Sequence, residues 1–256
     1  MKIRILGAHH TESAQTGFTS FLIDDILAVD AGALTSRLSF EEQQKLKGVL
    51  LTHQHYDHIR DIPALGMNFF LNNNCIEIYS TQTVYKVLSA HLLNDVLYPN
   101  YFEKPPEKPA IKFNTLTAGQ EESISGYTVL PVKVNHAVPT VGYQITSAGG
   151  KKVFITSDTG PGLADCWKQV TPDLLIIETT MLNKYNDSAR MTGHLTPELL
   201  RQEIISFKEI KGYLPQIIIK HINPLDEKEI RAEIETVSKS LSVSMLPAYE
   251  GMRINL

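Results

Sequence analysis

Four side chains that can bind a divalent metal ion lie close together in the first quarter of the chain. They are His53, His55, Asp57 and His58, in the segment Thr-His-Gln-His-Tyr-Asp-His. The chain has 9 histidines in all, so three of them beside an aspartate in one short segment are hard to attribute to chance. Imidazole and carboxylate ligands suit Zn, Fe, Mn or Co. The segment therefore predicts a metal site, and the simpler alternative is a polar surface loop.

This segment follows directly on the apolar run Gly-Val-Leu-Leu-Thr at residues 48–52, which is typical of a buried strand. Open α/β sheets bind their ligands at the carboxyl ends of the strands, where loops bring polar groups together. If the loop is extended, His53, His55 and Asp57 share one side of it, and a turn at 57–58 lets His58 face a second metal. One segment can thus contribute to two metal sites.

Three further candidate ligands stand at the ends of other apolar runs. They are His136 after residues 128–134, Asp158 after residues 153–156 and His221 after residues 216–219. Each of them alone is more simply interpreted as a turn or capping residue. Together they occupy the same relative position as the first cluster, so we interpret all of them as parts of one site.

The elements that must position these residues follow from the hydrophobic pattern. Short runs rich in Ile, Val and Leu, bounded by Gly, Pro, Asn or Asp, predict strands at residues 3–6, 20–23, 27–29, 48–52, 75–79, 128–134, 142–145, 153–156, 174–177, 216–219 and 252–254. Helices are predicted at 40–46, 81–97, 197–210 and 227–241. Thr196, Pro197 and Gly212 are the expected cap, first residue and stop of the third helix. The Pro-rich segment 98–112 is expected to be an irregular loop or arm. This pattern favours an α/β sandwich formed by a single domain over residues 1–256.

Composition and charge restrict the class of partner. The chain carries 24 Lys and Arg against 28 Asp and Glu, a formal net charge of -4. Proteins that grip long nucleic acids through the phosphate backbone usually carry a basic excess, so such a partner is disfavoured. No apolar run approaches the roughly 18 residues of a membrane span, and the start of the chain resembles a strand rather than a signal peptide. We expect a cytoplasmic protein with no membrane partner, and the sequence leaves open whether it forms a homodimer.

Five other residues with reactive side chains are expected to be ordinary. Cys75 and Cys166 have neither metal-type nor redox-type spacing, so both are predicted to be buried thiols. His9, His10 and His91 lie outside the motifs, although His10 is near enough to Gly7 to line a pocket.

The motif Thr-His-Gln-His-Tyr-Asp-His resembles the H-x-H-x-D-H signature of the metallo-β-lactamase superfamily. Asp30, His136, the segment Ser-Asp-Thr-Gly at 157–160 and His221 resemble its other motifs in the same order. The resemblance covers almost the whole chain. It implies a four-layer αββα sandwich with a binuclear metal site, in which Zn is the expected metal and Mn or Fe are the alternatives. It assigns one metal to His53, His55 and His136, the other to Asp57, His58 and His221, and a bridging role to Asp158. Asp30 would orient the ligands from behind, or it is a simple turn residue.

A second motif bears on the substrate. Thr-Gly-His-Leu-Thr at 192–196 resembles an element of the phosphodiesterase branches of this superfamily, namely the transfer-RNA 3' processing enzymes and the class II cyclic-nucleotide phosphodiesterases. In those enzymes the histidine lies beside the metals and meets the scissile phosphate, which implies a catalytic role for His194. The alternative is an exposed residue next to a helix cap. Glu178 is a candidate to orient the imidazole, or it is a buried carboxylate at a strand end.

These observations predict a phosphodiesterase with a small substrate such as a 3',5'-cyclic nucleotide. The processing enzymes usually carry a Gly-rich arm, whereas segment 98–112 is short and Pro-rich, which favours the cyclic-nucleotide group. One departure from that group counts against it: Tyr56 stands where the class II signature typically has Leu. In the expected mechanism a hydroxide that bridges the two metals attacks phosphorus, Asp57 accepts the proton of the water, and His194 stabilises or protonates the leaving oxygen. The alternatives are a transfer-RNA 3' processing activity, a lactone, ester or lactam hydrolase, and a non-catalytic nucleotide or metal sensor.

Overall fold

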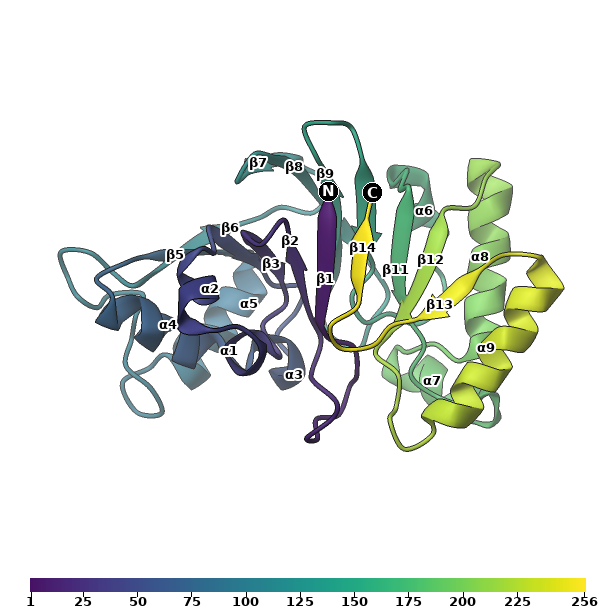
Figure 1. Ribbon diagram of the computed structural model, residues 1–256, viewed down its shortest axis with the longest axis horizontal. Helices are drawn as coiled ribbons and strands as arrows, with labels where there is room; N and C mark the ends of the chain where they lie inside the picture. Colours follow the sequence, from purple (N-terminus) through teal and green to yellow (C-terminus); the bar gives the residue numbers. More distant parts are fainter.

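Two seven-stranded sheets face each other in the computed structural model, which describes residues 1–256 (Figure 1). In spatial order the first sheet contains β14 (Arg253–Asn255), β1 (Lys2–Gly7), β2 (Ser20–Ile23), β3 (Leu27–Val29), β4 (Gly48–Leu50), β5 (Ile76–Ser80) and β6 (Ile111–Thr115). The second sheet contains β13 (Met245–Pro247), β12 (Gln216–Lys220), β11 (Leu174–Glu178), β10 (Lys152–Ile155), β9 (Val141–Thr146), β8 (Tyr127–Lys133) and β7 (Glu122–Ile124). Strands β3 to β6 are parallel to one another, and so are β10 to β13.

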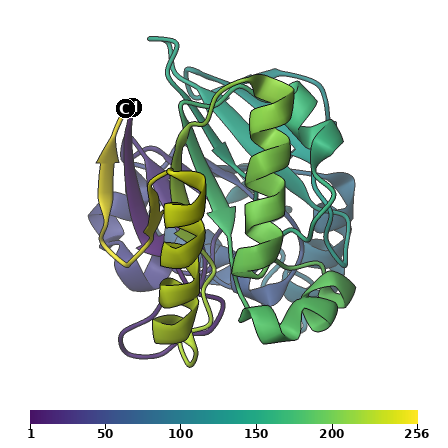
Figure 2. The same cartoon turned by 90° about the vertical axis from the view of Figure 1, so that its right-hand side faces the viewer.

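Helices cover the outer face of each sheet, so the molecule has four layers in the order αββα, as predicted (Figures 1 and 2). The first sheet is covered by α1 (Leu34–Arg37), α2 (Phe40–Gln44), α3 (Tyr56–Ile59), α4 (Ile62–Leu71) and α5 (Gln82–Val87), which continues as a π-helical turn (Leu88–Leu92). The second is covered by α6 (Ala164–Gln169), a 3-10 turn (Asn183–Tyr185), α7 (Asn186–Thr192), α8 (Pro197–Lys211) and α9 (Glu227–Leu241). None of these helices has the length and apolar character that a membrane crossing requires.

The central strands are apolar on both faces because both faces are covered. In β11, Leu174 and Ile176 point into the core between the sheets, while Leu175 and Ile177 pack against the helices of the second sheet. Each fully buried side chain of this size stabilises the fold by about 1.5–3 kcal/mol. This two-sided burial produces the unbroken apolar runs from which the strands were predicted.

Local signals fix the start and end of α8. The Thr196 hydroxyl accepts a hydrogen bond from Leu199 N, Pro197 occupies the first turn, and Gly212 ends the helix in the left-handed region with a φ of 77°. The predicted caps of this helix are therefore confirmed.

Two sequence predictions for the first sheet's side were wrong, and one helix was not predicted. The helix predicted at 81–97 ends at Leu92, because the Asn94 side chain accepts the N–H groups of Val96 and Leu97 and so holds a local turn instead. Helix α4 was missed because it contains Pro63 and Gly66; an alanine Cβ at Gly66 would lie 2.7 Å from the Tyr101 ring. Cys75 is exposed rather than buried, whereas Cys166 is buried.

Candidate metal centre

Polar residues from both sheets meet where the parallel strands end. Asp30 follows β3, His53 lies just beyond β4, Asp158 lies beyond β10 and His221 follows β12. The backbone turns sharply here, since Asp30 and His221 have φ values of 59° and 60° in the left-handed region that non-glycine residues seldom adopt. Strained residues of this kind concentrate at functional sites. The strand ends therefore bring the predicted site residues to one place.

One group of side chains contains His53, His55 and His136, whose ligand atoms all lie within 4.8 Å of one another. His53 is completely buried, yet its Nε2 has no hydrogen-bond partner in the chain. His136 Nε2 and His55 Nδ1 face each other at 3.2 Å, a separation that requires a proton or a cation between the two nitrogens. This arrangement fits a site that binds a metal ion.

A second group contains Asp57, His58, Asp158 and His221, again with ligand atoms within 4.8 Å. Asp158 Oδ2 lies 3.2 Å from His58 Nε2, 3.1 Å from His221 Nε2 and 3.9 Å from His53 Nε2, so this oxygen stands between the two groups. Asp57 and His58 belong to the first turn of α3, which corrects the expectation of an extended loop through residue 57. The turn still directs His58 toward the second group.

The outer nitrogen of most of these imidazoles is held by the protein, which directs the other nitrogen into the site. His58 Nδ1 donates to Asp30 Oδ2 at 2.8 Å, and His136 Nδ1 donates to Gly193 O at 2.8 Å. His221 Nδ1 donates to Thr180 Oγ1 at 3.0 Å, and His53 Nδ1 donates to Thr52 Oγ1 at 3.1 Å. Such contacts fix the tautomer and orientation of metal-binding histidines. The residues present thus fit two divalent cations with nitrogen and oxygen ligands.

Burial and charge set the protonation of the site. Burial lowers the pKa of His53 and brings the pKa of His221 to about 4, so both rings are neutral and can offer a lone pair. Burial opposes protonation of His58 too, but the carboxylates of Asp158, Asp30 and Asp57 outweigh it and raise the pKa of His58. These carboxylates make this part of the site attractive to positive charge.

Asp30 supports the site from behind. Its Oδ1 accepts hydrogen bonds from Thr52 N and Thr52 Oγ1, both at 2.9 Å, and its Oδ2 accepts from His58. Asp30→Ala leaves these donors unpaired, so we expect metal affinity to fall about 10- to 100-fold. Competition with a chelator measures that affinity. Asp30→Asn keeps an acceptor for Thr52 and tolerates the positive φ, so its metal affinity should lie between those of the wild type and Asp30→Ala. Unchanged metal affinity in both variants would make Asp30 a simple turn residue.

Lys220 is a residue that the sequence analysis did not identify. It is completely buried, and its Nζ donates to Asp158 Oδ1 at 2.8 Å. A lysine that ends the apolar run Ile-Ile-Ile immediately before a candidate ligand was the available signal. Lys220 holds one oxygen of Asp158 and so turns the other, Oδ2, toward the histidines.

His194 lies beside both groups. Its ring centroid is 5.0 Å from that of His136 and 5.5 Å from that of His221. Its Nδ1 donates to Glu178 Oε1 at 2.9 Å, which leaves Nε2 free. Burial opposes protonation, but the Glu178 carboxylate raises the pKa of His194 to about 9. His194 therefore carries a proton near neutral pH.

A cavity of about 340 Å³ opens onto this site, and its lining residues are His10, Phe18, His55, Tyr56, Asp57, Asp158, His194 and His221. His10 thus lines the site, as its position near Gly7 had allowed. His9 does not: it is buried and contacts Glu250 Oε1 at 2.7 Å and Glu227 Oε2 at 3.4 Å.

Comparison with known proteins identifies the family. A model described as a beta-lactamase superfamily domain matches residues 19–210. The chain belongs to this superfamily. The resemblance stated from the sequence motifs is therefore confirmed. Membership and the histidine and aspartate groups together imply divalent metal binding.

Several superfamily members are similar over most or part of the chain. Ribonuclease Z of Bradyrhizobium sp. (strain ORS 278) is 25% identical over 87% of this chain and 87% of its own length. The 3',5'-cyclic-nucleotide phosphodiesterase 1 of Saccharomyces cerevisiae is 25% identical over 41% of this chain and 29% of its own. The crystal structure of unliganded yeast PDE1 matches with a TM-score of 0.86 and 16% identity, and covers 100% of this chain and 99% of that one. The chain is a metal-dependent hydrolase of this superfamily, related to ribonuclease Z and to phosphodiesterases.

Proposed function

We propose that the protein is a phosphodiesterase that hydrolyses a small substrate, such as a 3',5'-cyclic nucleotide, at a binuclear metal site. The ligands would be His53, His55 and His136 for one cation and Asp57, His58 and His221 for the other, with Asp158 between them. The observation that carries the proposal is the place of His194. Its ring, oriented by a buried carboxylate, borders the same cavity as Asp57 and Asp158. A proton donor at that place suits a phosphate ester better than a lactam.

The chain's own residues have distinct tasks in this reaction. Two bound cations would supply the positive charge that activates water and neutralises the phosphate. Asp57 is ionised, since His58 and His221 outweigh its burial and hold its pKa well below the usual value, so it can accept a hydrogen bond from a water and orient it. The proposed mechanism also assigns to Asp57 the acceptance of that water's proton. His194 Nε2 can donate a proton to the ribose oxygen as the phosphorus–oxygen bond breaks.

Glu178 positions His194, so its replacement tests this role. Its two oxygens accept from four donors: Thr159 N, Thr180 Oγ1, Leu195 N and His194 Nδ1. Glu178→Gln should lower kcat about 10- to 100-fold. Because the carboxylate raises the pKa of His194, the alkaline limb of the kcat–pH profile should also move to lower pH. The profile of both proteins measures this; an equal loss at every pH would contradict the assignment.

The surroundings of the cavity support a small substrate. A neighbouring cavity of about 730 Å³ includes His136, and its walls contain one charged side chain, Lys133, among threonines and apolar groups. This lining suits a nucleoside better than a string of phosphates. Tyr101, within the Pro-rich segment, is buried and donates to Met67 Sδ on α4 at 3.1 Å. At this point the segment is therefore packed against the domain and does not project as an arm.

Transfer-RNA 3' processing is the second candidate. The similarity to the Bradyrhizobium ribonuclease Z over most of both chains favours it, while the net charge of -4 argues against a long RNA. The metal-loaded protein should be tested on cyclic AMP, cyclic GMP, a linear dinucleotide and precursor transfer RNA. We expect hydrolysis of a cyclic nucleotide. Cleavage of precursor transfer RNA alone would select the second candidate.

Two further arms of the same panel address the remaining classes. Turnover of a lactone or β-lactam without any phosphodiester would indicate an ester or lactam hydrolase. Nucleotide binding without turnover of any compound would indicate a sensor. Either result would exclude the proposed reaction.

A further inference from the structure

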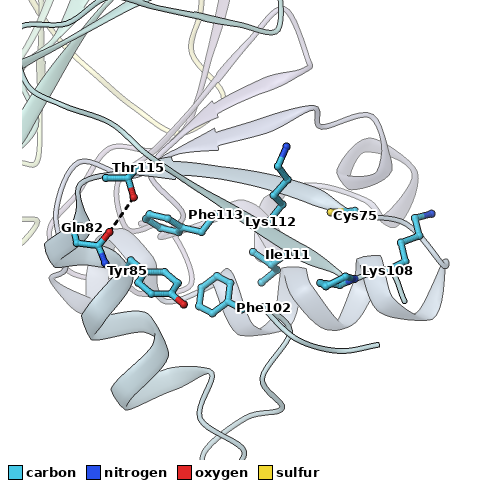
Figure 3. Close-up of a pocket in the computed structure, with 10 residues that line it drawn as sticks. Cys75, Gln82, Tyr85, Phe102, Lys108, Ile111, Lys112, Phe113 and Thr115 are labelled. Atoms are coloured by element: carbon cyan, nitrogen blue, oxygen red, sulfur yellow. Dashed lines mark hydrogen bonds between the residues drawn. The ribbon is translucent and has the colours of Figure 1, made fainter. Parts of the chain in front are cut away.

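A third cavity lies at the open edge of the first sheet, outside the metal centre. It has a volume of about 480 Å³ and runs along β6, which has no neighbour beyond β5 (Figure 3). Its walls come from β6, from α5 and from the end of the Pro-rich segment. We propose that this cavity binds a nucleoside monophosphate.

The edge strand offers the hydrogen bonds that recognise a planar base. Ala110 O accepts from Ile76 N and Leu116 N donates to Ser80 O, so the even-numbered residues of this stretch direct their groups toward β5. Phe113 and Thr115 therefore direct theirs away from the sheet, and their backbone groups have no partner elsewhere in the chain. One residue with a free donor and a free acceptor on the same side matches the paired donor and acceptor on the edge of a nucleobase.

Aromatic rings provide an apolar surface beside that edge. The ring of Tyr85 lies 5.2 Å from that of Phe102 and 5.0 Å from that of Phe113, and all three line the cavity. Figure 3 shows these rings gathered at one end, with Lys108 toward the other. A base that stacks on such a surface gains about 1–3 kcal/mol.

The charge of the lining favours an anion. Lys108 and Lys112 are its charged residues, and no carboxylate lines it, although the whole chain is acidic. Lys108 Nζ donates to Asn73 O at 2.6 Å, and Lys112 Nζ pairs with Glu77 Oε1 at 3.2 Å. Both contacts are exposed and weak, so the Lys108 amine can turn to a phosphate. Lys112 points away from the rings, toward Glu77 on the other face of the sheet, and adds positive charge at the rim of the cavity.

A nucleotide fits better than a peptide strand. Ile111 N already donates to Tyr101 O, so the free edge is confined to Phe113 and Thr115, which is too short for a full added strand. A compact cavity with rings at one end and an amine at the other matches a base joined to one phosphate.

The cavity also borders the cavity of about 730 Å³ that includes His136, which in the proposed function is the substrate cleft. Thr115 Oγ1 donates to Gln82 Oε1 at 3.0 Å, and both residues line this cavity as well as the neighbouring one that contains His136. A nucleotide here would share a wall with the cleft. That the nucleotide is the product of the enzyme rests on the proposed function; the binding itself does not.

Photo-crosslinking tests the site in the metal-loaded protein. With 8-azido-AMP we expect label on Tyr85 or Phe102, suppressed by excess AMP. The double variant Lys108→Ala/Lys112→Ala should lose about tenfold in labelling or more, because it loses the charge-assisted contacts to phosphate. Lys151→Ala, at an exposed turn, is the matched control and should label normally.

Three results would overturn the proposal. They are label confined to residues around His194, equal label in the double variant, and the absence of any label on the residues that line this cavity. The two claims fail separately. A protein that labels at this cavity but hydrolyses no cyclic nucleotide would retain the site and lose the proposed function, and active enzyme without label would do the reverse.

Discussion

Replacement of Asp158 by alanine should abolish the binding of at least one of two metal ions and lower turnover about a thousandfold or more. Asp158 Oδ2 lies within 3.2 Å of His58 Nε2 and His221 Nε2 and stands between the two groups of ligands. Bound cations supply several kcal/mol of transition-state stabilisation, and each 1.4 kcal/mol is about tenfold in rate. Elemental analysis of the purified variant and its rate on a phosphodiester measure the two effects.

The same change also removes the partner of a buried amine, and a control separates the two consequences. Lys220 is completely buried and donates to Asp158 Oδ1. An unpaired buried charge costs about 3–5 kcal/mol, so Asp158→Ala alone should also lower the free energy of unfolding. Asp158→Ala/Lys220→Met removes both charges and should regain most of the stability without regaining metal or activity. Two bound metal ions in the double variant would refute the bridging role.

Replacement of His194 by alanine should leave both metal ions bound and lower kcat about 10²- to 10⁴-fold, the usual contribution of a general acid. His194 Nδ1 is occupied by Glu178, and Nε2 faces the cavity. Steady-state kinetics with elemental analysis of the same preparation measure this.

His10→Ala is the matched control for that change. His10 lines the same cavity, and its ring lies 5.7 Å from that of His221, but no carboxylate holds it. We expect a much smaller loss of kcat from this variant. If His194→Ala loses metal, His194 is a structural residue or a ligand; if both variants lose the same activity, neither histidine is a specific proton donor.

The positions of His53, Asp158 and His221 could be predicted because each of them follows a strand whose apolar run is continuous. The burial of both sheet faces produces that signal locally, and parallel strands end at a common edge. Asp158 and His221 illustrate this, since both lie at the ends of strands that were predicted within one residue or two. The grouping of ligands into two sites was implied by the resemblance. In the structure His53, His55 and His136 lie together, and so do Asp57, His58, Asp158 and His221, while the assignment of each residue to a metal stays a prediction.

Other features depend on contacts that are distant in the chain. The burial of Lys220 requires Asp158, which is 62 residues away. Strand β6 takes its place from pairing with β5, after a Pro-rich segment that hides its pattern. Helix α4 accommodates Pro63 in its first turn, where proline has no intrahelical hydrogen bond to lose, and it tolerates Gly66 because its apolar residues pack on the first sheet and on Tyr101. Tertiary packing overrides local propensity in these elements.

The most direct test of the account is a metal titration of the metal-depleted protein. Zn²⁺ or Mn²⁺ is added in steps, and bound metal and hydrolysis of cyclic AMP and cyclic GMP are measured at each step. The account predicts that full activity appears when two ions are bound per chain. Full activity with no metal or with one ion, or two bound ions without hydrolysis of either cyclic nucleotide, would contradict it.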